Sequence, residues 1–400
     1  GGVNYMDNKA DRNNETRGAG SMSNTDLDRQ IDRYMAKRKL LGLGEFVIRN
    51  KKGNIILVRA LDVIGNEVIP DFVTHIGDGA FENCSGLQNI ELHDNIKYIG
   101  NRAFSGCKLL KRIRLPGSIE SIGALTFSNS GIKEAELGEG ITRISSKMFS
   151  ECRELKSINI PSTVSSMGRY VFHNCESLKR IELGKNITDI GECTFKGSGL
   201  KEAIIKSNIM KIPEGIFGEC VHLKRVVIPN TIMVIGRHAF NICLGLNTIE
   251  VIGNNNSNAN INLPDGLKII GIGAFRYCEK IENIKIPDTV KEIGAEAFER
   301  CNELKNVGIS KGIEILNRNI FSSCRSLNSI EIPDNVKEVK SGAFSKCELL
   351  RHVKIYNTNI KIHVDAFYEC NNLGQVDMVN GGRVKTVSMN GLYNRNGYNL

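Results

Sequence analysis

Phenylalanine recurs along this chain with a spacing that few folds can accommodate. Thirteen of the fifteen phenylalanines form one series in which neighbours are 22 or 23 residues apart, with a single gap of 35. The series is Phe81, Phe104, Phe127, Phe149, Phe172, Phe195, Phe217, Phe240, Phe275, Phe298, Phe321, Phe344 and Phe367. A fixed period of this length indicates stacked units that are each too small to bury their own apolar residues. The repeat therefore overrides the two or three compact domains that 400 residues would otherwise suggest.

The same apolar columns surround every phenylalanine, and the clearest unit is IPDTVKEIGAEAFERCNELKNVGI, from Ile286 to Ile309. An aliphatic residue stands five positions before each of the thirteen phenylalanines. After the phenylalanine, Leu304, Val307 and Ile309 alternate with polar residues in the manner of a short strand with one buried face. Parallel strands lie about 4.8 Å apart, so thirteen coils predict a curved rod roughly 60 Å long with the phenylalanines inside.

Two coils are one residue shorter than the rest, and both change in the same way. In FSNSGIKEAEL and FKGSGLKEAII the cysteine is replaced by serine, a glycine follows, and the strand isoleucine becomes Ala135 or Ala203. A glycine also follows the aliphatic residue in many coils, as at Gly100 and Gly294, but Pro213 occupies the same column. Because proline fixes φ near −65°, we expect tight packing, and not a left-handed turn, to be the reason for these glycines.

These columns resemble the BspA-type leucine-rich repeats, whose signature is IPxxVxxIGxxAFxxCxxLxxI. The segments IPDTVKEIGAEAFERCNELKNV and IPDNVKEVKSGAFSKCELLRHV match it closely, and the resemblance covers residues 64–378. It implies a right-handed leucine-rich-repeat superhelix of about thirteen coils with a parallel β-ladder. It also implies a bacterial or protist surface protein that binds host proteins or other cells, and it carries over no catalytic residue.

Cap elements are expected at the N-terminal side of the solenoid. Residues 1–22 are polar and predict a disordered tail, whereas residues 23–63 predict a helix and a hairpin. Thr25 and Asp28 fit a capping box for a helix over 25–41, which Gly42 or Gly44 would end. The apolar runs 46–48 and 55–58 flank a turn and predict the hairpin.

Two other segments depart from the repeat. The long gap holds an asparagine-rich insertion, 252–266, which is polar enough to be expected in solvent. At the other end Asn359 stands where an aliphatic residue belongs, so the last coil is expected to be less regular than the others. Residues 379–400 are interpreted as a cap strand or as a disordered tail.

Eleven of the twelve cysteines stand three residues after a phenylalanine, and Cys193 is the exception. No CxxC pair is present, and stacked coils would direct neighbouring Cβ vectors in parallel, so zinc sites and disulfides are both disfavoured. Buried free thiols are the expected state. The string Gly308-Ile309-Ser310-Lys311-Gly312 imitates a hydrolase motif but has no helix after it. We therefore predict no catalytic residue, metal or cofactor, and no enzymatic activity.

A column of cations is the most suggestive surface feature, because lysine follows the repeat leucine in six consecutive coils. The candidate binding residues from this column and its neighbours are Lys111, Arg112, Arg114, Lys156, Lys179, Arg180, Lys224 and Arg225. Like charges about 5 Å apart repel, which would suit an acidic ligand. Interleaved glutamates, including Glu134 and Glu202, favour the alternative of an ordinary solvated face.

The net charge of +9 lies mostly outside the repeats, because residues 1–60 hold twelve Lys/Arg against seven Asp/Glu. This distribution argues against nucleic-acid binding, and no apolar run is long enough for a membrane span. We predict a monomeric adhesion or binding scaffold for a protein or glycan partner, at the cell surface or secreted. The alternative is an intracellular interaction or regulatory module that binds through the helix at 25–41. The first 45 residues are too polar for a secretory signal, which makes a cytoplasmic location the alternative.

Overall fold

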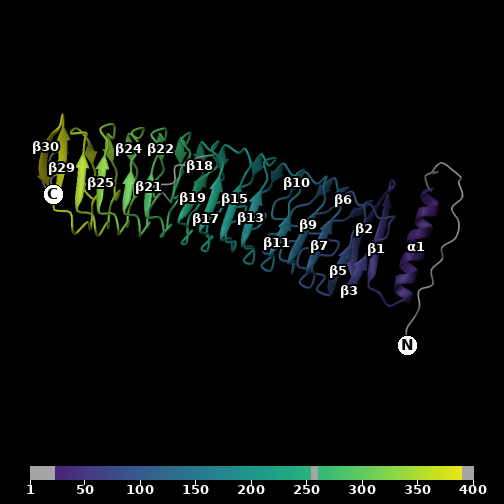
Figure 1. Ribbon diagram of the computed structural model, residues 1–400. Helices are drawn as coiled ribbons and strands as arrows, with labels where there is room; N and C mark the ends of the chain where they lie inside the picture. Colours follow the sequence, from purple (N-terminus) through teal and green to yellow (C-terminus); the bar gives the residue numbers. More distant parts are fainter. Residues whose placement is uncertain (1–22, 254–259, 390–400) are drawn as a thin grey trace.

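The chain folds into an elongated solenoid, shown from end to end in Figure 1. The structure is a computed structural model that describes residues 23–253 and 260–389. Helix α1 (Asn24–Leu40) lies at one end, and the hairpin of β29 (Gln375–Asn380) and β30 (Arg383–Ser388) lies at the other. The predicted tail at 1–22 and the segments 254–259 and 390–400 lie outside the described residues.

Each coil contributes one strand of three to six residues to a long parallel ladder, which we call the strand face. Its strands are β3 (Gly65–Val68), β5 (Leu87–Glu91), β7 (Arg112–Leu115), β9 (Glu134–Leu137), β11 (Ser157–Asn159), β13 (Arg180–Leu183), β15 (Glu202–Ile205), β17 (Arg225–Ile228), β19 (Thr248–Val251), β21 (Asn283–Lys285), β23 (Asn306–Gly308), β25 (Ser329–Ile332), β27 (His352–Ile355) and β29. This ladder confirms the alternation read from the sequence, because the second and fourth residues of most of these strands are buried.

A second parallel ladder of two-residue strands runs along another side of the rod. It consists of β4 (His75–Ile76), β6 (Tyr98–Ile99), β8 (Ser121–Ile122), β10 (Arg143–Ile144), β12 (Ser166–Met167), β14 (Asp189–Ile190), β16 (Lys211–Ile212), β18 (Val234–Ile235), β20 (Ile269–Ile270), β22 (Glu292–Ile293), β24 (Ile315–Leu316), β26 (Glu338–Val339) and β28 (Lys361–Ile362). The buried second residue of each pair is the aliphatic residue predicted five positions before the phenylalanine.

The phenylalanines form one continuous stack through the interior, as predicted. Neighbouring ring centroids are 5.0 to 5.9 Å apart, and the ring planes differ by 4 to 19°. The first twelve rings of the series are completely buried. A single hydrophobic core therefore runs the length of the solenoid.

A ladder of thiols lies beside the ring stack. In ten coils the cysteine Sγ lies 3.0 to 3.3 Å from the carbonyl oxygen of the phenylalanine in the preceding coil. Ser130 and Ser198 take the cysteine position in the two short coils and contact the next thiol. All twelve cysteines are free, which confirms the expectation of buried thiols for all but the half-buried Cys84 and Cys193.

The glycine column is explained by close packing. A Cβ on Gly100 would come within 2.4 Å of the backbone nitrogen of Asp78, and one on Gly294 within 2.3 Å of that of Ile272. Neither glycine has a positive φ. The left-handed residues lie elsewhere, two positions before and two positions after the phenylalanine, as at Arg102 (φ 54°) and Gly106 (φ 76°) around Phe104.

The N-terminal cap contains the predicted helix and hairpin, but its N-cap differs from the prediction. Ser23, not Thr25, caps α1: its hydroxyl accepts a hydrogen bond from the backbone N–H of Asp26 at 3.2 Å. Ser23 and Asp26 have the same spacing as the expected pair, two residues earlier in the chain. β1 (Glu45–Lys51) and β2 (Asn54–Leu61) form the antiparallel hairpin, and β2 pairs with the first two-residue strand.

The insertion and the last coil depart from expectation. The prediction that 252–266 would lie in solvent is wrong for its described second part, because Ile261 and Leu263 are buried. Ile261 bridges Ile249 and Ile284 in the strand ladder. The last coil is as regular as the others at this position, because Ile360 fills the buried site that Asn359 leaves. Residues 375–388 form the terminal hairpin, which matches the cap-strand alternative.

Candidate functional site

The strand face is the surface on which the predicted cations gather. Arg112 and Arg114 are outward residues of β7, and they alternate with the buried Ile113 and Leu115. The next strand, β9, presents Glu134 and Glu136 in register with them, because the two strands pair residue for residue. The period of two in each strand thus brings the arginines and the glutamates onto one face.

Ion pairs across neighbouring strands neutralise most of this face at its N-terminal part. Arg112 Nε lies 3.1 Å from Glu134 Oε2, and Arg114 Nε lies 3.6 Å from Glu136 Oε1. All four side chains are more than half exposed. Such exposed pairs each contribute about 0–1 kcal/mol to stability, so they can exchange partners at low cost.

A second set of pairs spans β13 to β19. Arg180 Nη1 lies 3.0 Å from Glu202 Oε2, and Arg225 contacts both Glu202 and Glu250, with 2.7 Å between its Nη2 and Glu250 Oε2. The hydrogen bonds that Arg225 donates to Glu250 and then to Glu202 raise the pKa of Arg225 above its usual value, because they favour the charged form. Arg180 and Arg225 are therefore held in a row whose charges alternate in sign.

The lysine column divides into two groups. Lys111 Nζ donates to the carbonyl oxygen of Lys108 at 3.1 Å and pairs with Glu154 at 3.0 Å, while Lys179 Nζ donates to the carbonyl oxygen of Glu176 at 2.6 Å. Both lie over the glycine of the following short coil, where a Cβ would approach the two ammonium groups within 2.9 and 2.6 Å. These two lysines serve the local structure of the turn.

The other members are freer. Lys133 shares Glu154 with Lys111, at 3.5 Å. Within residues 23–253 and 260–389, Lys156, Lys201 and Lys224 have no ion pair. Glu154 thus relieves the expected repulsion between Lys111 and Lys133. The ammonium groups of Lys156, Lys201 and Lys224 remain available to solvent or a ligand.

A shallow depression crosses the predicted site. It has a volume of about 810 Å³ and spans β3, β5, β7, β9 and β11. Its lining includes Arg112, Arg114, Glu134 and Glu136, with the partly buried Ile158 at its far side. A broad hollow of this kind suits a macromolecular surface better than an enclosed small molecule.

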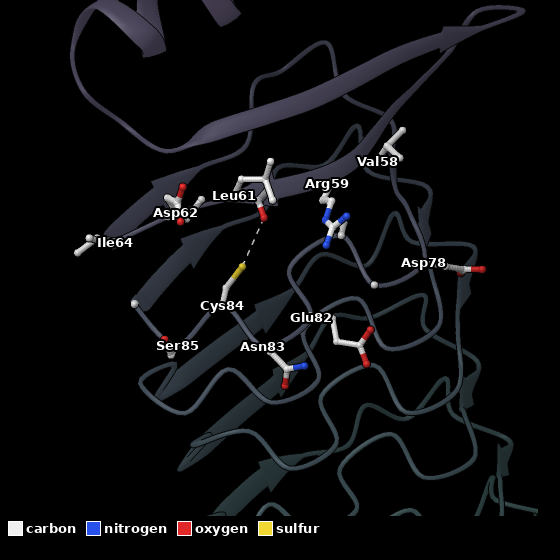
Figure 2. A pocket seen from close by; sticks show the side chains of 15 residues that line it. Val58, Arg59, Leu61, Asp62, Ile64, Asp78, Glu82, Asn83, Cys84 and Ser85 are labelled. Atoms are coloured by element: carbon white, nitrogen blue, oxygen red, sulfur yellow. Dashed lines mark hydrogen bonds between the residues drawn. The ribbon is translucent and has the colours of Figure 1, made fainter.

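Figure 2 shows a second cleft, where the cap hairpin meets the first coil. Its volume is about 730 Å³, and Arg59, Asp62, Asp78 and Glu82 line it. Burial raises the pKa of the Cys84 thiol, which lies 3.7 Å from the carbonyl oxygen of Ala60. The carboxylates are spread around the cleft, and no group of three potential metal ligands occurs among the residues that the structure describes.

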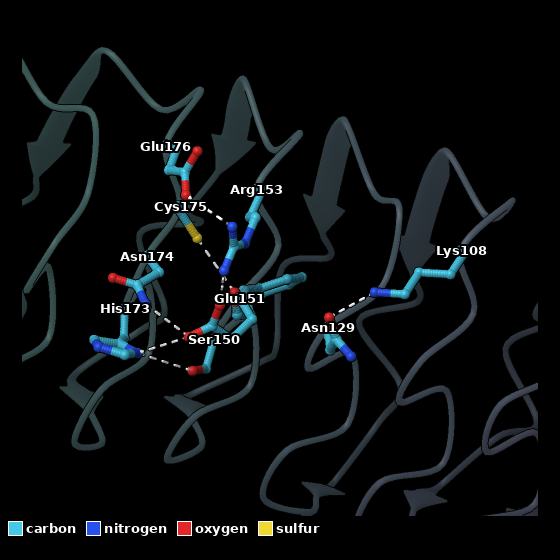
Figure 3. Close-up of polar contacts among 10 residues, drawn as sticks. Lys108, Asn129, Ser150, Glu151, Arg153, His173, Asn174, Cys175 and Glu176 are labelled. Atoms are coloured by element: carbon cyan, nitrogen blue, oxygen red, sulfur yellow. Dashed lines mark hydrogen bonds and ion pairs between the residues drawn. The ribbon is translucent and has the colours of Figure 1, made fainter.

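Figure 3 shows a cluster in which Ser150, Glu151 and His173 imitate a catalytic triad. Glu151 Oε1 and Ser150 Oγ lie 3.4 and 3.5 Å from the same ring atom, Nδ1 of His173. A triad needs the acid and the nucleophile on opposite ring nitrogens. Glu151 is further engaged by Arg153 at 3.2 Å and by Asn174 at 2.7 Å, and burial lowers the pKa of His173. The cluster joins neighbouring coils and lacks the geometry for nucleophilic catalysis.

The hydrolase-like string is equally unsuited to that chemistry. Ser310 is completely buried; its hydroxyl donates to the carbonyl oxygen of Val290 at 2.9 Å and accepts from the backbone N–H of Gly312 at 2.9 Å. The hydroxyl of Ser310 therefore stabilises the local backbone and is not accessible to a substrate. Across the described ranges, the structure contains no helix that is long and apolar enough to cross a bilayer.

Comparison with known proteins identifies the repeat. The family model described as the BspA type leucine rich repeat region matches residues 63–175, 142–259 and 253–374. No curated protein matches the sequence.

Several solved structures are similar to this chain. The pneumococcal vaccine antigen PcpA has a TM-score of 0.50 at 18% identity, with 79% of this chain and 92% of that chain covered. A leucine-rich cell surface protein from Faecalibacterium prausnitzii has a TM-score of 0.48 at 23% identity, covering 86% and 94%. A leucine-rich repeat protein from Bacteroides ovatus has a TM-score of 0.46 at 21% identity, covering 80% and 98%. The assignment to the leucine-rich repeats rests on the family model.

Proposed function

Because this chain belongs to the BspA-type leucine-rich repeat family, we propose that it is a non-enzymatic adhesion scaffold that binds a protein partner on its strand face. Repeat solenoids offer an extended surface in place of a deep pocket, and their partners contact many coils at once. Leucine-rich repeats are protein-interaction modules, which supports the general role.

One observation carries the choice of surface: the depression over β3 to β11 contains Arg112 and Arg114, two of the cations singled out from the sequence. Arg112 and Arg114 line it together with the glutamates that pair with them. A partner with complementary carboxylates can take over these exposed arginines without leaving a buried charge unpaired. Charged pairs of this kind steer association and define register more than they add affinity.

The contact residues of this proposal follow the strand face toward its middle. They are Lys111, Arg112, Arg114, Lys156, Lys179, Arg180, Lys224 and Arg225. The unpaired Lys156 and Lys224 are the members best suited to an acidic ligand, whereas Lys111 and Lys179 are already bonded to backbone carbonyls. We therefore place an acidic protein segment ahead of a neutral one as the partner of this column.

The remaining proposals concern the oligomeric state, the location and the class of ligand. We propose a monomer at the cell surface or secreted, as the family resemblance implies, with glycan as the second class of ligand. The alternative of an intracellular module that binds through its helix is confined to the polar face and the C-terminal end of α1, where Leu40 is exposed. Leu27, Tyr34 and Met35 of α1 pack against the core and Ile31 is buried, so the apolar face of the helix is occupied.

Binding to a panel of purified extracellular-matrix proteins tests the proposed surface. The double variant Arg112→Glu/Arg114→Glu is compared with Arg143→Glu/Arg169→Glu, a matched change on the side of the two-residue strands. We expect the first variant to lose at least tenfold in affinity for any ligand of the wild type, and the second to bind normally. An equal loss in both variants, or no loss in the first, would refute the assignment.

The lysine column is tested separately with Lys156→Glu/Lys224→Glu. We expect the variant to bind more weakly than the wild type at low salt. If this difference in affinity vanishes at high salt, it supports an acidic partner, because salt screens exposed charge pairs. Unchanged binding ends the proposal for these lysines.

A further inference from the structure

One coil of the strand face lacks an outward side chain that every other coil has. In β23 the second outward position is Gly308, whereas the corresponding residues in the neighbouring strands are Lys285 and Glu331. In the other coils this position carries residues such as Arg114, Glu182 or Lys354, and never glycine. The row of side chains is therefore interrupted at this point.

The interruption coincides with a hollow. Residues of β23, of β25 and of the segment that follows β27 enclose a depression of about 730 Å³, within the range of small-molecule sites. Val307 lies at its floor and is partly exposed, although its counterparts Ile284 and Ile330 are buried. The hollow thus exposes apolar surface between Lys285 and Glu331, the charged residues of the neighbouring strands.

An aromatic ring forms one wall. Tyr356 follows β27 and is 39% exposed, and its hydroxyl donates to Glu331 Oε2 at 3.3 Å. Lys354 holds the same carboxylate at 3.3 Å. The ring is consequently oriented by its hydroxyl while part of its surface remains open to solvent.

Polar groups form the rest of the rim. Asn306 donates through its amide nitrogen to Asn283 at 2.6 Å, which leaves its carbonyl oxygen as an acceptor, and Ser329 offers a hydroxyl. Lys311 and Asp334 add one charge of each sign. Since the charge of Glu331 is also balanced by Lys354, the rim has no excess that would select an ion.

From this combination we infer that the hollow around Gly308 binds a neutral saccharide unit. A pyranose ring has a face of C–H groups, which fits against an aromatic ring and an apolar floor, and equatorial hydroxyls that both donate and accept hydrogen bonds. The floor at Val307, the wall at Tyr356 and the rim at Asn306 and Ser329 supply these partners. The site is separate from the surface proposed for a protein partner, which lies near the other end of the strand face.

Substitution of Gly308 is a clean way to fill the hollow. Its φ is not in the left-handed region, and the atoms nearest to an added Cβ belong to Lys285, at 3.4 Å for the side-chain Cγ and 3.7 Å for Cα. Gly308→Thr therefore fills the hollow without strain in the fold. Tyr356→Ala is the second variant, because it removes the wall without changing the strand. Gly374→Thr is the matched control, since a Cβ at Gly374 meets nothing within 4 Å.

Saturation-transfer NMR titrations of the full chain with glucose, galactose, mannose, N-acetylglucosamine and sodium glucuronate test the inference. We expect at least one neutral sugar to bind, with binding weakened at least tenfold in Gly308→Thr and Tyr356→Ala and unchanged in Gly374→Thr. Thermal unfolding verifies that each variant is folded. The inference is overturned if no neutral sugar binds, if glucuronate alone binds, or if the folded Gly308→Thr variant binds like the wild type. None of these outcomes depends on the ligand of Arg112 and Arg114.

Discussion

The guanidinium of Arg38 on α1 and the carboxylate of Glu67 on β3 form a bidentate ion pair, with N–O distances of 2.7 and 2.9 Å, in which both side chains are 5% exposed. Arg38 Nε also donates to the carbonyl oxygen of Gly44 at 2.8 Å, and its guanidinium lies 3.8 Å from the ring centroid of Phe46. The pair therefore joins the helix, the hairpin and the first strand of the strand face.

Removal of one partner should detach the cap. We expect Arg38→Ala to weaken the docking of the cap on the solenoid by about 3–5 kcal/mol, because Glu67 is left buried without a countercharge. Hydrogen exchange of the α1 amides measures this directly. The double variant Arg38→Met/Glu67→Met, which removes both charges, should recover most of the protection. Equal loss in the single and double variants would show that packing around Arg38, and not the charge pair, holds the helix.

The ring stack makes a second prediction about stability. Phe217 lies between Phe195 and Phe240, with centroid distances of 5.6 Å to each, and is completely buried. Phe217→Ala should lower the free energy of unfolding by about 3–5 kcal/mol. Among the aromatic rings of the described residues, Phe367 has a neighbour on one side only, at 5.3 Å, and it is 4% exposed, so Phe367→Ala should cost less. Urea unfolding compares the two, and a larger loss at the terminal ring would contradict a shared core.

The repeated parts of this fold are the parts that could be predicted from sequence. The rings, the thiols and the glycine at Gly100 recur because each coil solves the same packing problem as the coil before it. One register then predicts the surroundings of every copy.

Features that occur only once in the chain were not predictable, because the repeat pattern holds no information about them. Arg38 stands in the last turn of α1, where a cation is favourable without any partner, and the carboxylate that it binds is 29 residues away in a different element. Lys111 belongs to the cation column, but the short coil that follows it turns its ammonium group back onto the backbone. Ile261, within a polar insertion, joins the ladder through isolated bridges to Ile249 and Ile284, which the composition of the insertion does not indicate.

The buried thiols predict a steep loss of stability in alkali. Burial raises the pKa of Cys152 to about 11 and those of Cys107 and Cys220 to about 12, from an ordinary value of 9.0. Above pH 9 the unfolded chain releases thiol protons that the folded chain retains, so stability falls as the pH rises. The contribution of each thiol is complete below pH 9 and is lost progressively toward pH 12, by about 1.4 kcal/mol per pH unit.

Cys220→Ser isolates one member of this ladder, since Ser198 already occupies the equivalent position in the preceding coil. Urea unfolding between pH 8 and the alkaline limit of folding measures the slope for the wild type and the variant. The slope of the variant should be shallower by the contribution of one thiol. Identical slopes would mean that Cys220 ionises as readily in the folded chain as in the unfolded one.

The left-handed positions beside the phenylalanines make a prediction that depends on backbone conformation alone. Arg102 has a φ of 54° and an exposed side chain, and its backbone N–H donates to the carbonyl oxygen of Ala124 at 2.9 Å. A left-handed residue with a Cβ costs roughly 1–2 kcal/mol, least for asparagine and most for β-branched residues. Arg102→Asn should therefore leave stability unchanged or raise it, whereas Arg102→Val should lower it by about 1–2 kcal/mol. Lys291, which is exposed and has no positive φ, is the control site. If valine is tolerated equally at both sites in thermal unfolding, the turn does not hold Arg102 in the left-handed region.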